Sequence, residues 1–280
     1  MSVLDFILNL AALLLWINWR MLGIEGRARA TGGTLLGTLK RINPAPAQRW
    51  SHLLGLVVLL GLRSLLYGQL GGALNWVPQL PFVVVSIPFR SDLPWRMPLY
   101  SLGSFGLTLA VFYLWLLLLS LLNRRLPDTD PVQRLVRLHL GWLENWPQWI
   151  KPLLPLPLMA PLWFLLAKLL VHWQILPPAV SSGQTWQQGL VLGLASLLAW
   201  KYLILGILAL RLVTSHVYLG HAPIWNYIDA TARQILRPIG WLPLRLGRMD
   251  LAPLFGLGLA WLAFTFAARG LTMLYQKLPL

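Results

Sequence analysis

Long apolar stretches separated by polar, basic segments dominate the pattern of residues along this chain. Six of these stretches carry almost no charge, and they lie at 3–19, 52–71, 99–122, 153–173, 189–215 and 252–274. A helix of about 20 residues crosses about 30 Å of hydrocarbon, so each stretch has roughly the length that a membrane span needs. The pattern therefore predicts an all-α membrane protein with about six transmembrane helices.

One further apolar stretch, from Leu80 to Phe89, is too short to cross a bilayer as a helix. Prolines interrupt it and flank it, at Pro78, Pro81 and Pro88. Proline lacks a backbone N–H and disfavours a regular helix interior. Three interpretations stay open: a surface segment, a re-entrant segment or a short strand within the loop.

Composition supports the membrane class and narrows the chemistry. Hydrophobic residues make up 57% of the 280 residues, and the mean hydropathy is +0.65. Cysteine is absent, which excludes disulfides, thiol catalysis and cysteine-ligated metals. The 23 Lys and Arg against 8 Asp and Glu give a net charge of +15. Because the basic residues fall mostly between apolar stretches, we expect them to set topology and to attract anionic lipids, with no nucleic acid as partner.

The distribution of basic residues predicts an orientation. The segments 20–51, 123–152 and 216–251 hold six, five and four Lys and Arg, against two in 72–98 and none in 174–188. By the positive-inside rule, the three basic segments are cytoplasmic and both termini lie outside. The first apolar stretch lacks a basic n-region and a small-residue cleavage site, so we expect a retained span and not a signal peptide.

An internal repeat emerges when the chain is compared with itself at an offset of 92 residues. The matches pair Pro131 with Pro223, Trp149 with Trp241, and 160–162 with 252–254, where both copies read Ala-Pro-Leu. We expect three regions: 1–98 with two spans and a Pro-rich loop, a degenerate repeat at 99–173, and a second repeat at 189–274. Each repeat is a helical hairpin, so the fold contains two tandem helical-hairpin repeats.

The middle of each repeat has apolar residues mostly at helical spacing. The first copy reads DPVQRLVRLHLGWLENW and the second APIWNYIDATARQILRP. A short basic amphipathic helix that lies in the lipid headgroups fits this pattern. The alternative is a helix whose apolar face packs on the rest of the protein.

The end of the second repeat carries a recognisable motif. The run TARQILRP at 231–238 is followed by a proline, a glycine and the sequence MDLAP at 249–253. This resembles the YggT family of small bacterial and plastid membrane proteins, over about residues 200–274. In the first repeat, Leu158 stands where the motif has its aspartate. The motif positions are Thr231, Arg237, Pro238, Pro243, Gly247, Asp250 and Pro253.

The resemblance implies a non-enzymatic accessory protein of the bacterial inner (cytoplasmic) membrane. Members of the family are linked to assembly of membrane complexes and to envelope or osmotic stress. The implied partners are anionic lipids of the bilayer and other membrane proteins, with no cofactor and no catalytic residues. A small transporter or channel with a path between the repeats is the alternative. A membrane-embedded enzyme is a third class, but the sequence lacks the usual metalloprotease and serine-hydrolase motifs.

Two cations, Arg63 and Lys201, fall near the middle of predicted spans, where a charge costs several kcal/mol. We expect no intramembrane carboxylate partner, because Asp5 is taken to precede the first apolar run. The interpretations left open are backbone carbonyls or a water-filled crevice, a lipid headgroup or partner protein, and a substrate path.

Asp250 lies directly before the last span. We expect its carboxylate to cap that helix by accepting the N–H of Ala252. A proton or ion site and a contact with a partner protein are the alternatives. Gly189 and Gly193 form a GxxxG motif, which is compatible with close helix packing.

Overall fold

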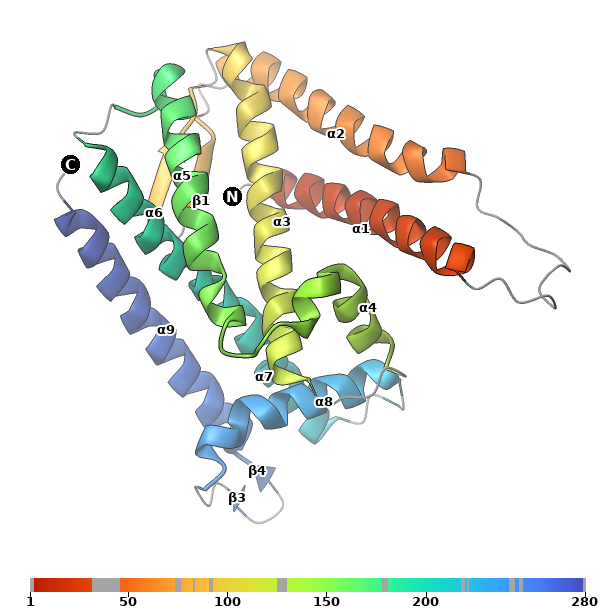
Figure 1. The fold of residues 1–280 in the computed structure, drawn as a ribbon. Helices are drawn as coiled ribbons and strands as arrows, with labels where there is room; N and C mark the ends of the chain where they lie inside the picture. The colour runs from red at the N-terminus through yellow and green to blue at the C-terminus, as the bar shows by residue number, and fades with distance from the viewer. Residues whose placement is uncertain are drawn as a thin grey trace, which may run out of the picture. The chain divides into compact units, whose positions relative to one another are not determined.

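The computed structural model describes most of the chain: residues 3–31, 46–73, 77–82, 84–90, 93–124, 130–177, 181–217, 220, 222–241, 245–246 and 249–278. Within these ranges, side chains at 24–31, 46–48, 72–73, 94, 245–246 and 249–250 are not described. The fold is helical, as Figure 1 shows, with two small pairs of strands.

Six segments of the described chain are long and apolar enough to cross a membrane. They are Val3–Gly23, Arg49–Gly71, Met97–Leu122, Lys151–His172, Ser182–His216 and Ala252–Lys277. These confirm the expected fold class and the six predicted spans. The protein is thus a multi-pass helical membrane protein.

The spans are built from seven helices: α1 (Val3–Thr31), α2 (Pro46–Ala73), α3 (Met97–Leu122), α5 (Pro155–His172), α6 (Ser182–Ser196), α7 (Trp200–His216) and α9 (Ala252–Lys277). The 3-10 turn η4 (Leu197–Ala199) joins α6 to α7 within the fifth span. That span begins earlier than predicted, because Ser181 caps α6 by accepting the N–H of Gln184 at 3.2 Å. The first residues of α6 are polar, so the hydropathy pattern did not include them in the predicted span.

Short elements connect the spans. Two are α-helices, α4 (Pro131–Leu140) and α8 (Pro223–Leu236). The 3-10 turns are η1 (Pro94–Arg96), η2 (Gly141–Asn145), η3 (Lys151–Leu153) and η5 (Arg237–Ile239). α4 begins where Pro131 follows Asp130, whose carboxylate accepts the N–H of Val132 at 2.9 Å. This combination of a capping aspartate and a proline at the first helical position is a strong start signal.

The proline-rich stretch adopts the strand alternative. β1 (Gln79–Phe82) pairs with β2 (Val85–Pro88) in a two-stranded sheet. Leu80 and Ile87 are buried, and the Phe89 N–H donates to the carbonyl of Pro78 at 2.8 Å. A second pair, β3 (Arg245–Leu246) and β4 (Met249–Asp250), is antiparallel.

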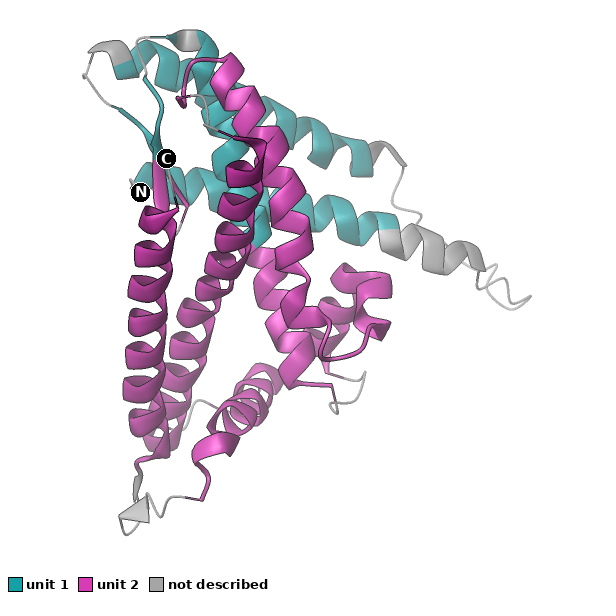
Figure 2. Ribbon diagram, turned by 60° about the vertical axis from the view of Figure 1, so that its left-hand side comes forward, with its two compact units in different colours: residues 1–80, 87–110 teal, residues 81–86, 111–280 magenta. Residues whose placement is uncertain are grey.

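The chain divides into two compact units, coloured separately in Figure 2. Unit 1 contains residues 1–80 and 87–110, and unit 2 contains 81–86 and 111–280. In unit 1, α1 and α2 pack together, and Phe105 of α3 joins a core with Ala12, Leu56 and Leu60. The first half of α3 therefore belongs with the N-terminal helices. This division is based on packing within the structure. The boundary expected at residue 98 is based on sequence similarity between the repeats, which packing does not test, and it stays a prediction.

Unit 2 contains two apolar cores that correspond at the offset of 92 residues. In the first, Leu116 of α3 packs with Val136 and Leu140 of α4. In the second, Leu208 of α7 packs with Ile228 and Ala232 of α8. Two surrounding positions also correspond, so that the five matched pairs are 112/204, 116/208, 136/228, 140/232 and 143/235. The same span-to-short-helix contact is built twice, which supports the predicted repeat.

The inner faces of α4 and α8 pack on protein. Their buried residues are Gln133, Val136, His139 and Leu140 on α4, and Tyr227, Ile228, Thr231 and Ala232 on α8. For these faces the structure favours packing on the protein over burial in lipid headgroups. Other apolar side chains nearby are exposed, among them Trp142 at 70% and Trp241 at 79%. Their location at a membrane surface stays a prediction.

Candidate functional site

The most buried charged group in unit 1 is the guanidinium of Arg63 on α2. Its Nη2 lies 2.8 Å from Oδ1 of Asp5 on α1, and the two side chains are 0% and 2% exposed. Removing two charges from water costs several kcal/mol per ion, and only close pairing with further hydrogen bonds compensates for it.

Four more side chains form hydrogen bonds with this pair, although the buried Nε of Arg63 has no hydrogen-bond partner among the described residues. Arg63 donates to Oδ1 of Asn9 at 2.7 Å and to Oγ of Ser104 at 2.9 Å. The hydroxyls of Tyr67 and Tyr100 donate to the Asp5 carboxylate at 2.6 and 3.2 Å. Both tyrosine rings also lie 5.4 Å from the guanidinium carbon. The six side chains form what we call the Arg63 cluster: Asp5, Asn9, Arg63, Tyr67, Tyr100 and Ser104.

Helical spacing explains how three helices build this cluster. Its members come as i, i+4 pairs, with 5 and 9 on α1, 63 and 67 on α2, and 100 and 104 on α3. Residues at this spacing lie on one face of a helix, one turn apart. Ala12 and Leu60 continue the faces of α1 and α2 into the apolar core of unit 1, and Phe105, next to Ser104 on α3, joins the same core. The cluster is thus a polar layer at one end of a packed three-helix interface.

The expectation that Arg63 lacks a carboxylate partner was wrong. α1 begins at Val3, so Asp5 lies in the first turn of the span and not before it. Arg63 donates hydrogen bonds to Asp5, Asn9 and Ser104. These side chains take the place of the expected partners, which were backbone carbonyls, a water-filled crevice or a lipid headgroup. Sequence reasoning missed the other five members of the cluster, although their i, i+4 spacing within apolar stretches was a usable signal.

Lys201, the second intramembrane cation, lies on α7 and belongs to unit 2. Its Nζ is 5.9 Å from the centroid of the Trp261 ring on α9. A cation over an indole face is attracted by the ring quadrupole. The structure therefore gives Lys201 an aromatic partner, which differs from the expected types.

Four other cations of unit 2 pair with carboxylates, one of them Arg137 of α4, whose Nε lies 3.8 Å from Glu144. Lys151 of η3 is 5% exposed, and its Nζ donates to Ser120 at 2.6 Å and lies 3.4 Å from Glu144. Ser120 also donates to Glu144. Arg211 of α7 and Arg233 of α8 both pair with Asp229. The pair of Arg211 and Asp229 joins the end of α7 to α8, whereas that of Arg233 and Asp229 lies within α8.

Thr231, the first motif residue, is fully buried on α8. It accepts a hydrogen bond from Nδ2 of Asn123 at 2.7 Å and donates to the carbonyl of Tyr227 at 2.7 Å. Since Asn123 directly follows α3, this contact ties the end of one repeat's span to the other repeat's short helix.

A second polar contact links the short helices of the two repeats. The hydroxyl of Tyr227 on α8 donates to Oε1 of Gln133 on α4 at 3.3 Å. Burial raises the pKa of Tyr227 to about 12, and the charges of Asp130 and Glu144 act in the same direction. The hydroxyl is therefore protonated, and able to donate, at neutral pH.

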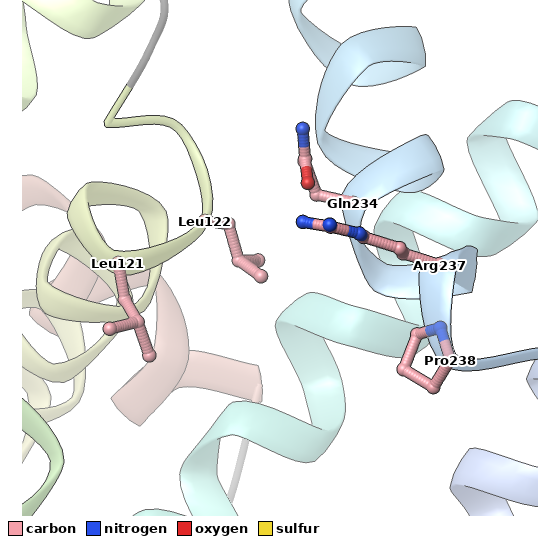
Figure 3. A pocket seen from close by; sticks show the side chains of 5 residues that line it. All are labelled: Leu121, Leu122, Gln234, Arg237 and Pro238. Carbon is pink, nitrogen blue, oxygen red and sulfur yellow. The ribbon is translucent and has the colours of Figure 1, made fainter. Parts of the chain in front are cut away.

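Arg237 and Pro238 line an open pocket of about 440 Å³ at the end of α8. Its other lining residues are Gln234 on α8 and Leu121 and Leu122 on α3. Figure 3 shows the side chains of Gln234 and Arg237 directed toward the side of the leucines. Among the motif residues, Thr231, Arg237 and Pro238 are thus gathered on one short segment.

The remaining motif residues are only partly visible. Pro243, Gly247 and the carboxylate of Asp250 lie outside the described residues and side chains. The backbone of Asp250 pairs with Arg245 in the β3–β4 pair, and α9 begins at Ala252 with Leu251 in the capping position. Pro253 is buried in the first turn of α9. Capping by Asp250 stays a prediction.

No group of three or more metal-ligating side chains comes together in the part of the chain that the structure describes. The geometry on which a function can rest is therefore the Arg63 cluster, the polar contacts between the repeats, and the Arg237 pocket. None of the protein-family models, curated proteins or solved structures compared with this chain matches it.

Proposed function

We propose that this protein is a non-enzymatic membrane accessory protein that organises or assembles other membrane components, as the resemblance to the YggT family implies. The resemblance rests on the motif residues of the second repeat alone. The proposal places the working surface on the segments between the spans, at the inner membrane of a bacterium, and it treats the spans as a scaffold.

The observation that carries the proposal is a contrast between two sets of cations. Near the middle of the spans, Arg63 and Lys201 contact Asp5 and Trp261 of the same chain. Between the spans, three arginines are exposed and have no side-chain partner among the described residues: Arg124, Arg134 and Arg237. A cation that is paired within the fold contributes to its stability. An exposed cation without a partner in the chain can instead attract and bind an anionic partner.

Charge reversal at the three free arginines tests this proposal. A variant with Arg124→Glu, Arg134→Glu and Arg237→Glu is expected to lose most of the membrane proteins that co-purify with the detergent-solubilised wild type. Like charges placed at an interface cost several kcal/mol, so the loss should be large. The measurement is quantitative mass spectrometry of the purified complexes.

The matched control replaces the same three arginines with lysine, which keeps the charge. It is expected to retain the wild-type set of partners. Retention of that full set by the glutamate variant as well would overturn the proposal, provided both variants elute from size exclusion as the wild type does.

The Arg63 cluster favours a second candidate, a proton-coupled transporter. An ionisable residue inside a membrane span often marks a proton or ion path, and the carboxylate expected to be missing is present as Asp5. In this case Asp5→Asn, which keeps the hydrogen-bonding shape but removes the charge, is expected to abolish proton-driven flux in liposomes. Equal proton flux in wild-type, Asp5→Asn and protein-free liposomes would count this candidate out.

A further inference from the structure

The Arg237 pocket joins two segments that lie far apart in the sequence. One wall is the end of α3, with Leu121 and Leu122, and the other is the end of α8 and the start of η5, with Gln234, Arg237 and Pro238. The walls differ in character, as Figure 3 shows: one presents apolar side chains, and the other presents an amide and a guanidinium. A ligand that fills the pocket must satisfy both.

The polar wall is suited to an anionic oxygen group. Arg237 and Gln234 are exposed, and neither side chain has a partner among the described residues. A guanidinium presents its N–H donors as a planar fork that matches phosphate oxygens. Gln234 adds an amide donor beside it. Phosphate is therefore a group that this wall is equipped to bind.

The apolar wall distinguishes a lipid from a free ion. Leu121 and Leu122 line the same cavity and are half-buried. Burial of apolar surface contributes about 25 cal/mol per Å², and only a ligand with an apolar part gains it. A phospholipid carries a phosphate next to acyl chains and so matches both walls, whereas inorganic phosphate matches one.

The two walls are held in place by a buried hydrogen bond next to the pocket. Asn123, the residue after Leu122, donates to Thr231, one turn before Gln234. Both of these side chains are 2% exposed or less. The pocket is consequently a built feature of the contact between the repeats. α3 ends here, and by the predicted orientation this end faces the cytoplasmic leaflet, where anionic lipids are concentrated.

We propose that the Arg237 pocket binds the phosphate of an anionic phospholipid of the cytoplasmic leaflet, with Arg237 and Gln234 on the headgroup and the two leucines against the lipid's apolar part. The assignment rests on the proposed accessory function and deepens it, because it names one membrane component that the protein holds. It also gives Arg237, a residue of the motif, a defined role.

Native mass spectrometry of the purified full chain with added phosphatidylglycerol or phosphatidylcholine tests this assignment. The wild type is expected to retain one phosphatidylglycerol preferentially. Arg237→Gln should bind it about tenfold more weakly, since a hydrogen bond to a charged group is lost. Arg269→Gln, which removes an exposed arginine that neither lines the pocket nor belongs to the three free arginines, is the matched control and should bind as the wild type does.

Three outcomes would overturn the assignment. They are equal retention of the two lipids by the wild type, equal weakening by Arg237→Gln and Arg269→Gln, and displacement of the lipid by an excess of inorganic phosphate. The readout is lipid occupancy, so it is separate from the protein partners that test the proposed function. Loss of lipid from Arg237→Gln, together with retention of all protein partners by the triple glutamate variant, would leave this site standing and remove the accessory role.

Discussion

Replacement of Asp5 by leucine is expected to lower the free energy of unfolding by about 3–5 kcal/mol, the range found when one partner of a buried ion pair is removed. The reason is the environment of Arg63, whose side chain is 0% exposed. Without the carboxylate, its guanidinium keeps hydrogen bonds to Asn9 and Ser104 but loses its counter-charge. The hydroxyls of Tyr67 and Tyr100 lose their acceptor at the same time.

Heating of the detergent-solubilised protein followed by size exclusion measures this effect as a lower midpoint of the loss of the folded peak. The double variant Asp5→Leu with Arg63→Met should recover most of the midpoint, because a buried ion pair replaced by apolar residues is often neutral. Arg269→Met is the matched control, since it removes an exposed cation from another span. If the double variant were no more stable than Asp5→Leu, the ion pair would not explain the loss.

The Arg63 cluster also shows what a hydropathy pattern predicts and what it misses. The six spans could be predicted because hydropathy averages over about 20 residues, and one aspartate or arginine barely changes that average. For the same reason Asp5 was not considered as a partner of Arg63, although the predicted stretch 3–19 contains it. Arg63 and Asp5 are 58 positions apart in the sequence, and only the packing of α1 against α2 brings them into contact.

The two apolar cores of unit 2 correspond at the offset that predicts the repeat, because spacing is kept where residue identities are not. Only Leu116 and Leu208 are identical among the core pairs, while Val136 corresponds to Ile228 and Leu140 to Ala232. The smaller alanine in the second copy shows that the two cores were adjusted separately. The Arg237 pocket was not predictable, although two of its residues belong to the motif, because Leu121 and Leu122 reach it only through the contact between α3 and α8.

Gly189→Leu is expected to separate α5 from α6, because the GxxxG motif proves to be a contact between helix backbones. A Cβ placed on Gly189 would lie 2.7 Å from the Cα of Ala160, and one on Gly193 would lie 3.0 Å from the Cα of Leu156. Backbone atoms cannot rotate away as a side chain can, so the helices must move apart. Overpacking of this kind costs about 1–3 kcal/mol and at times more.

The absence of cysteine from the chain makes this separation directly measurable. The stacked rings of Phe164 on α5 and Trp186 on α6 have centroids 5.4 Å apart. Cysteines introduced at these two positions should be joined efficiently by a short bifunctional maleimide, and Gly189→Leu should reduce that yield several-fold. Gly206→Leu is the matched control, since a Cβ there meets nothing within 4 Å.

The control also separates two explanations of the motif. Glycine in a helix interior costs up to about 1 kcal/mol relative to alanine, so replacing it raises helix propensity at both sites. If helix propensity dominated, Gly189→Leu and Gly206→Leu would both preserve the cross-linking yield. The close approach of α5 and α6 would then not require glycine at position 189. If close packing dominates, only the first variant loses yield, and glycine at 189 is required by the neighbouring backbone despite its cost to the helix.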